Sequence, residues 1–314
     1  MCASSRWFRR PGTLALVMAA LSVPVNPFVV LAQAPDPRAE AHFSYDKGAP
    51  LDLKLLSIKT LGTVAVQDIT YSGRNGETVP AYLVIPKSER KFAAVIWGHW
   101  LMPGAGNSNR EEFLEEAVAL APAGVISLLI DAPQARPDYK PTPNPALVAQ
   151  QVVDVRRGLD LLLSRPDVDA ERIAYVGHSW DAGIGAILDA LDKRFSAFVF
   201  MSGPQSMREY ILSSDSTRIL AMRKTADLAK LEQSLTANAW ADPGSYAGNF
   251  GPAPALFQYG LHDEEWVPLA DAKDYLAMTT GPKQAEFYDA DHALNAKARL
   301  DRDSFLRAEL SLRP

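Results

Sequence analysis

Short apolar runs recur along the chain between about residues 60 and 290, separated by polar loops or by amphipathic stretches. Residues 64–71 and 79–85 alternate loosely between apolar and polar positions around Ser72-Gly-Arg-Asn-Gly76, which predicts a β-hairpin. Residues 125–130 form a continuous apolar run, as is typical of a strand buried on both faces. Further short strands are expected at 93–97, 173–176, 195–201, 255–259 and 285–288.

Helical periodicity fills most of the intervals between these strands. Apolar residues three and four positions apart predict helices at 111–121 and 145–164, and Arg156 and Arg157 are expected on the solvent side of the second. The apolar face of that helix is made by Val152, Val153, Leu159, Leu162 and Leu163. Other helices are expected at 182–191, near 206–238, at 269–279 and at 296–310. This alternation predicts an α/β fold with a mostly parallel sheet covered by helices on both faces.

The segment from about 203 to 252 is longer than a connection between neighbouring strands requires. It contains several large side chains: Met207, Tyr210, Trp240, Tyr246 and Phe250. We interpret it as a helical insertion before the penultimate strand. A lid over the strand ends and a packed helical insert fit the pattern equally well.

Residues 1–34 have the features of a targeting segment. Three arginines within the first ten residues precede an apolar run from 13 to about 31, and Ala32 and Ala34 fit the A-x-A cleavage pattern of a secretory signal peptide. The run is nearly long enough to be a retained membrane anchor, but prolines interrupt it. We therefore expect export to the periplasm or the medium, with one domain over 35–314 and no stable membrane insertion after cleavage.

Composition excludes several classes of protein. The 314 residues are 47% hydrophobic and 22% charged, which is ordinary for a globular chain and unlike a disordered or multi-span membrane protein. The net charge is −5 and no basic run occurs in the body of the chain, so nucleic acid is not an expected partner. The only cysteine is Cys2, so neither an intrachain disulfide nor a thiol nucleophile is expected.

The clearest chemical motif is Gly177-His-Ser179-Trp-Asp181, which lies between a predicted strand and a predicted helix. A strand, a sharp turn and a helix are the context in which a G-x-S-x-G elbow exposes a nucleophilic serine. Small residues at the start of the helix favour this interpretation. In this arrangement the backbone N–H of Trp180 points at a developing oxyanion.

A serine nucleophile needs a base, and the base needs an orienting acid, which follow the serine in the order acid, then histidine. His292 comes directly after the last predicted strand and is the candidate base. Asp263 follows the preceding strand and best fits the acid, with Glu264 as the alternative. His262 is expected to be a solvated loop residue, and His178 a packed or hydrogen-bonded residue of the elbow.

The second oxyanion donor is expected in the loop after the 93–97 strand, as the backbone N–H of Trp100 or of Leu101. Trp100, Trp180 and Trp266 each flank one of the predicted catalytic loops. An aromatic-walled acyl pocket and ordinary core packing are equally consistent with these three tryptophans.

Taken together, these motifs resemble the dienelactone hydrolase-like branch of the α/β-hydrolases. They are also similar to acetyl xylan esterases and to the catalytic domains of prolyl-oligopeptidase-type enzymes. The resemblance extends from about 60 to 312 and is carried by residues 152–160, 167–179, 256–263 and 288–295. It implies an eight-stranded core, ester hydrolysis without a metal or cofactor, and Ser179, Asp263 and His292 as the catalytic triad. True dienelactone hydrolases use a cysteine nucleophile, so their substrate is not implied.

Two acidic residues depart from the pattern of these relatives. Asp181 stands where the elbow has its second glycine, and Asp291 precedes His292 where a small residue is common. We include Asp181 and Trp266 among the candidate pocket residues. A carboxylate at 181 fits three outcomes equally: a tuned active site, a substrate with a cationic group, or lost activity.

The sequence therefore predicts an exported serine hydrolase that cleaves small carboxylic esters through an acyl-enzyme. The alternatives are a catalytically impaired binding protein of the same fold, or a peptidase or thioesterase. The peptidase is disfavoured because the sequence contains no propeller or other large gating domain. The sequence indicates neither the acyl and alcohol specificity nor the oligomeric state.

Overall fold

The computed structural model describes residues 39–87 and 91–312, so the predicted signal peptide over residues 1–34 lies outside the described residues. The strands are β1 (Lys54–Leu61), β2 (Val64–Ser72), β3 (Thr78–Pro86), β4 (Phe92–Gly98), β5 (Val125–Ile130), β6 (Val168–His178), β7 (Ala197–Met201), β8 (Ala255–Gly260) and β9 (Lys283–Tyr288). The α-helices are α1 (Ala39–His42), α2 (Leu114–Leu120), α3 (Asn144–Leu163), α4 (Trp180–Leu191), α5 (Met207–Ser213), α6 (Thr217–Arg223), α7 (Leu228–Ala237), α8 (Leu269–Met278) and α9 (Ala296–Glu309).

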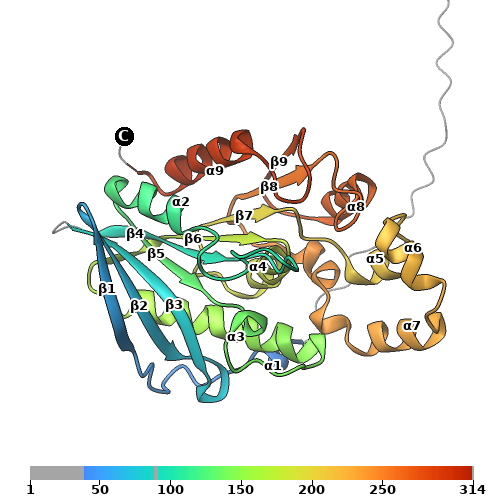
Figure 1. Ribbon diagram of the computed structural model, residues 1–314, viewed down its shortest axis with the longest axis horizontal. Helices are drawn as coiled ribbons and strands as arrows, with labels where there is room; N and C mark the ends of the chain where they lie inside the picture. The colour runs from blue at the N-terminus through green and yellow to red at the C-terminus, as the bar shows by residue number, and fades with distance from the viewer. Residues whose placement is uncertain (1–38, 88–90, 313–314) are drawn as a thin grey trace, which may run out of the picture. The chain divides into compact units, whose positions relative to one another are not determined.

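All of the strands in the described part of the chain belong to one sheet, in the order β1-β2-β3-β5-β4-β6-β7-β8-β9 (Figure 1). The pairs from β1 to β5 are antiparallel, and every neighbouring pair from β5 to β9 is parallel. The carboxyl ends of β4, β6, β8 and β9 therefore meet at one edge of the sheet, where open α/β sheets bind their ligands.

Among the described residues, strand β1 is the one strand that the hydrophobic pattern does not predict, and it brings the sheet to nine strands where eight are expected. Every position of β1 is exposed, and it pairs only with β2 at one edge of the sheet. Alternation between apolar and polar residues arises from burial of one face. In β1 the apolar residues Leu55, Leu56, Ile58 and Leu61 do not alternate regularly, and the pairing with β2 shifts register between Leu55 and Ser57, so the pattern typical of a strand is absent.

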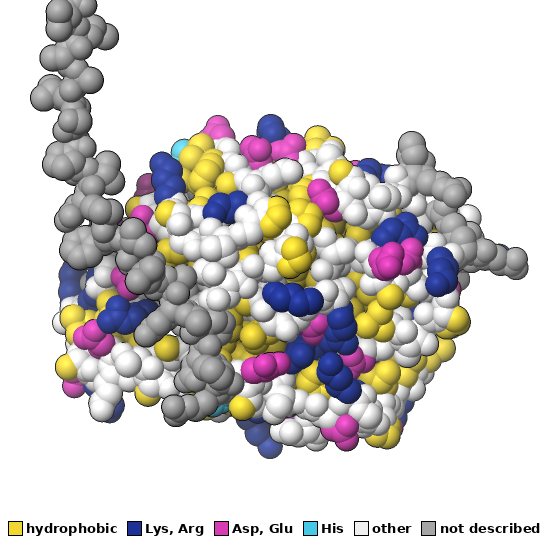
Figure 2. Space-filling model, turned by 180° about the vertical axis from the view of Figure 1, so that it is seen from behind, with side chains coloured by type: hydrophobic (Ala, Val, Ile, Leu, Met, Phe, Trp, Pro, Cys, Tyr) yellow, Lys and Arg dark blue, Asp and Glu magenta, His cyan; other side chains and the backbone are white. Residues whose placement is uncertain are grey.

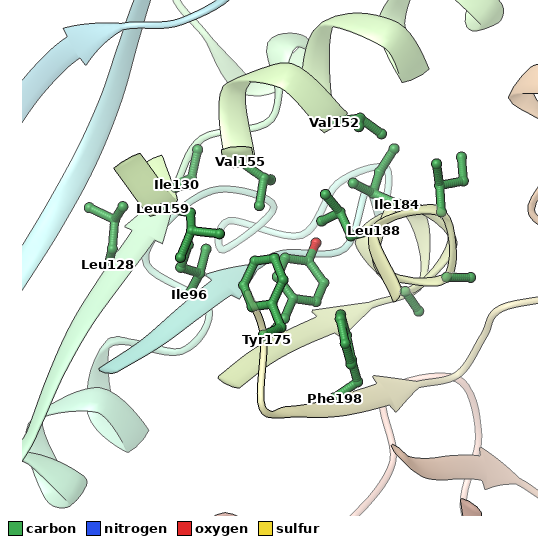
Figure 3. Close-up of a cluster of buried hydrophobic side chains, with 14 of the residues drawn as sticks. Ile96, Leu128, Ile130, Val152, Val155, Leu159, Tyr175, Ile184, Leu188 and Phe198 are labelled. Atoms are coloured by element: carbon green, nitrogen blue, oxygen red, sulfur yellow. The ribbon is translucent and has the colours of Figure 1, made fainter. Parts of the chain in front are cut away.

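Helices cover both faces of the sheet, as the sequence predicts. Helices α3, α4 and α8 pack on one face, and α2 and α9 pack on the other. Figure 3 shows part of the first layer, where Val152, Val155 and Leu159 of α3 and Ile184 and Leu188 of α4 lie over the side chains of the central strands. This layer fixes α4, and with it the turn that precedes α4, against the sheet.

Arg156 and Arg157 do not lie on the solvent side of α3, and that expectation is wrong. Both are buried. Arg156 forms an ion pair with Asp192 (3.0 Å), and Arg157 donates to the carbonyls of Ala49 and Pro50 (both 2.8 Å). The hydrogen bonds of Arg157 hold the segment before β1 against α3, a role that helical periodicity does not reveal.

Over residues 39–87 and 91–312, no helix has both the length and the apolar character that a bilayer crossing requires. On the described part of the face drawn in Figure 2, basic and acidic side chains lie interspersed with one another.

Candidate active site

Ser179 occupies a sharp turn between β6 and α4. Its backbone has φ 55° and ψ −107°, a region that non-glycine residues rarely adopt. A Cβ added at Gly177 would lie 2.3 Å from the carbonyl oxygen of Asp181, so the chain can fold back this closely only with glycine there. A strained turn of this kind holds the serine hydroxyl above the end of the sheet.

The three side chains proposed from sequence meet at this edge. His292 Nε2 lies 2.8 Å from Ser179 Oγ, and His292 Nδ1 lies 2.5 Å from Asp263 Oδ2. The other oxygen of Asp263 accepts the backbone N–H of Trp266 (3.0 Å). Glu264, the alternative acid, is exposed.

These contacts indicate which atoms of the site carry the protons. An ionised Asp263 accepts the proton of His292 Nδ1, which leaves Nε2 free to accept the hydroxyl proton of Ser179. Asp263 and His292 are both about 5% exposed, so solvent competes little for this chain of hydrogen bonds. Such an arrangement can transfer a proton from the hydroxyl while the oxygen attacks a carbonyl carbon.

The loop that carries His292 is held by its backbone. The carbonyl oxygen of His292 accepts hydrogen bonds from Ser202 Oγ (2.6 Å) and from His178 Nε2 (2.9 Å). His178 is buried, and its Nδ1 lies 2.5 Å from Glu112 Oε1. His178 is therefore hydrogen-bonded within the elbow, as expected from sequence, whereas Ser202 and Glu112 are not expected there.

The backbone N–H of Trp100 is not free to bind an oxyanion, contrary to expectation. It donates to Glu112 Oε2 (2.7 Å). Within the described residues, the N–H of Leu101, the alternative donor expected in this loop, makes no hydrogen bond. Trp180 is the first residue of α4, where backbone N–H groups have no partner within the helix.

The carboxyl group of Asp181 does not line a pocket, so that expectation is also wrong. It is fully buried beneath the elbow, where Oδ1 accepts from Gln151 Nε2 (2.9 Å) and the Tyr175 hydroxyl (3.0 Å). A Cβ added at Gly98 would come within 2.5 Å of Asp181 Cβ, so the glycine missing at 181 is compensated by a glycine on β4. Burial raises the pKa of Asp181 to about 6.

Trp266 lies beside the imidazole of His292, with ring centroids 5.8 Å apart. Trp100 lies near both histidines, with its ring stacked 4.9 Å from His178 and 6.4 Å from His292. Two tryptophan rings therefore lie close to the imidazole of His292.

The insertion before β8 contacts the loop that carries Asp263. The hydroxyls of Tyr210 and Ser216 both donate to the carbonyl of Glu265 (2.7 Å each), and Gln205 donates to that of Trp266 (2.8 Å). The guanidinium of Arg218 lies 4.1 Å from the centre of the Trp266 ring. The insertion thus supports the loop of the acid from outside.

His262, the other histidine that follows Ser179 in the sequence, lies apart from the site. His262 is largely exposed and contacts the exposed carboxylate of Asp289 (2.6 Å). In the described part of the chain, no group of three or more His, Cys, Asp or Glu side chains is arranged to hold a metal ion.

No protein-family model matches this sequence, and neither does any curated protein sequence. Solved structures do match. The acetyl xylan esterase from Paenibacillus sp. R4 is 20% identical over 87% of this chain and 92% of its own, with a TM-score of 0.68. Acetyl xylan esterase 1 from Thermoanaerobacterium sp. JW/SL YS485 is 16% identical over 86% of this chain and 92% of its own, with a TM-score of 0.67.

A prolyl endopeptidase structure also matches, with 17% identity and a TM-score of 0.62, but the match covers 80% of this chain and only 39% of the endopeptidase. These likenesses confirm the prediction of the α/β-hydrolase fold.

Proposed function

We propose that this protein is a serine hydrolase of small carboxylic esters, with Ser179, His292 and Asp263 as a catalytic triad. The observation that carries the proposal is the continuous chain of hydrogen bonds from the Ser179 hydroxyl through both nitrogens of His292 to Asp263. Two acetyl xylan esterases among the structures of similar fold support an ester as the substrate class.

In the proposed reaction, Ser179 Oγ attacks the ester carbonyl while His292 Nε2 takes its proton. His292 then protonates the leaving alcohol, and Asp263 stabilises the imidazolium that forms in between. A water molecule, deprotonated by His292, then attacks the acyl carbonyl, and His292 returns the proton to Ser179 Oγ as the acid departs. No metal or cofactor takes part in these steps.

We propose the backbone N–H groups of Trp180 and Leu101 as the donors that stabilise the oxyanion. Leu101 replaces Trp100 in this role because the Trp100 N–H donates to Glu112. Trp266 and Trp100 are proposed as the walls beside the reacting ester. We also propose that the protein is exported, since residues 1–34 have the pattern of a signal peptide.

The test compares Ser179→Ala with the control Ser196→Ala. Ser196 is also partly buried, but its hydroxyl donates to a backbone carbonyl. A fluorophosphonate probe should label the parent and Ser196→Ala but not Ser179→Ala, and p-nitrophenyl acetate hydrolysis should follow the labelling. Folded parent protein that neither reacts with the probe nor turns over esters of any chain length would contradict the proposal. That result would favour a binding protein.

A further inference from the structure

A second carboxylate–imidazole unit lies directly behind the candidate active site. His178 Nδ1 and Glu112 Oε1 are 2.5 Å apart, and both side chains are less than 10% exposed. Glu112 lies in the segment before α2, and His178 is the last residue of β6. Since no step of the proposed reaction uses either residue, the pair needs another explanation.

The partners of His178 determine where its protons lie. A carbonyl oxygen can only accept a hydrogen bond, so His178 Nε2 must donate its proton to the carbonyl of His292. The contact between His178 Nδ1 and Glu112 Oε1 then holds one further proton shared by the pair. The other oxygen of Glu112 accepts the N–H of Trp100, so the carboxylate satisfies two donors at once.

Through these contacts the pair joins three loops. The loop after β4 is bound through Trp100, the elbow contributes His178, and the loop after β9 is bound through the backbone of His292. Stacking of the Trp100 ring on His178 adds a second connection between the first two loops. The residue held at the end of this chain is the one whose imidazole lies 2.8 Å from Ser179 Oγ.

We propose that Glu112 and His178 are positioning residues, which fix the backbone of His292 so that its imidazole points at Ser179. This inference rests on the proposed function, because alignment of the imidazole matters only if His292 is the base. A displacement of about 1 Å in a catalytic group costs on the order of a hundredfold in rate. A hydrogen bond on the backbone of the base can therefore control turnover without touching the substrate.

The first test observes the protons directly and requires no activity. In the full chain labelled with ¹⁵N-histidine, long-range ¹H–¹⁵N spectra should show Nε2 of His178 as protonated. A strongly deshielded ring proton should be present in the parent and lost or shifted in Glu112→Gln, with the signals assigned by their absence in His178→Phe. An unprotonated Nε2 on His178 would overturn the proposal, whatever becomes of the esterase activity.

The second test is kinetic and uses p-nitrophenyl acetate. Glu112→Ala should lower kcat about tenfold to a hundredfold, with KM nearly unchanged. Glu112→Gln should recover most of this loss, because the amide can accept the Trp100 N–H and donate to His178 Nδ1. Glu116→Ala is the matched control, because Glu116 lies on α2, is partly buried and pairs with Arg302 (2.6 Å).

Two kinetic outcomes would overturn the proposal. An unchanged kcat in Glu112→Ala would show that the pair does not align His292. A higher kcat would show that the carboxylate competes with the oxyanion for the Trp100 N–H. If Glu112→Ala does not fold, Glu112→Gln and the spectra still decide the matter. Failure of Ser179→Ala to abolish turnover would instead refute the proposed function.

Discussion

Two buried pairs, Asp263–His292 and Glu112–His178, share the contact between carboxylate and imidazole Nδ1 and differ in what the imidazole Nε2 contacts. In each, a carboxylate oxygen lies 2.5 Å from an imidazole Nδ1. The Nε2 of His292 faces a hydroxyl, whereas the Nε2 of His178 faces a backbone carbonyl. A hydroxyl has a proton to give and a carbonyl has none, so only His292 can act as a base toward its partner. What the far nitrogen faces thus separates a candidate base from a residue that holds the base in place.

The largest expected effect comes from replacing each of the two histidines, His292 and His178, by alanine. His292→Ala should reduce kcat for p-nitrophenyl acetate by about a millionfold, as expected when a triad base is lost. His178→Ala should cost no more than about a hundredfold, because only alignment is lost. Equal losses in the two variants would remove the distinction between the pairs. Circular dichroism of both variants controls for folding.

The acid of the first pair provides the next comparison. Asp263→Asn should reduce kcat about ten-thousand-fold, because an amide at this position stabilises the wrong tautomer of His292. Glu264→Gln should change kcat by less than about twofold, since the exposed side chain lies outside the hydrogen-bond chain. If only the Glu264 variant lost turnover, the assignment of Asp263 would be wrong.

Another buried carboxyl group, that of Asp181, makes no hydrogen bond to any imidazole that the structure describes, and its pH dependence sharpens the comparison. Burial raises its pKa from 3.8 in the unfolded chain to about 6 in the folded chain. Between these values the folded state binds a proton that the unfolded state has lost, so the stabilising contribution is greatest below about pH 4 and is lost as the pH rises to about 6.

Asp181→Asn has no such proton to lose. From about pH 4 to pH 7, its unfolding free energy should therefore rise by about 3 kcal/mol relative to that of the parent. Urea titrations of both proteins across this range measure the difference. Parallel pH profiles for the two proteins would show that Asp181 does not titrate as the burial of its carboxyl group requires.

The smallest expected effect tests how the elbow accommodates Asp181. Gly98→Ala should destabilise the fold by about 1–3 kcal/mol, because the new methyl group overlaps the Asp181 side chain. Adding Asp181→Gly should restore most of the lost stability. Gly106→Ala serves as the control, since an added Cβ there meets no atom within 4 Å. Thermal unfolding of the four proteins reports the outcome, and equal losses in the single and double variants would exclude this compensation.

Much of the fold follows from local pattern. The buried strands and the amphipathic helices leave periodic signals, so eight strands and the helices between them are predictable. Strand β1 is not, because its apolar residues do not alternate regularly and a register shift interrupts its pairing with β2. The burial of Arg156 and Arg157 is not predictable either, since Asp192, which pairs with Arg156, and the carbonyl of Ala49, which binds Arg157, lie outside the helix.

The candidate site divides in the same way. Ser179, Asp263 and His292 follow directly from chain order and from their positions after strands. Glu112 carries no comparable signal, because it lies in a segment rich in acidic residues and meets His178 across 66 residues of sequence. The elbow motif marks Asp181 as an exception, but its compensation by Gly98 depends on strand pairing that no local motif reveals.

The double hydrogen bond from Tyr210 and Ser216 to the Glu265 carbonyl has a practical consequence for engineering. An exchange of the segment between β7 and β8 for that of another hydrolase would change more than substrate preference. It would also remove the outer support of the Asp263 loop. Chimeras therefore need to keep these two hydroxyls, or a donor in each place, if the graft is to be compared fairly with its parent.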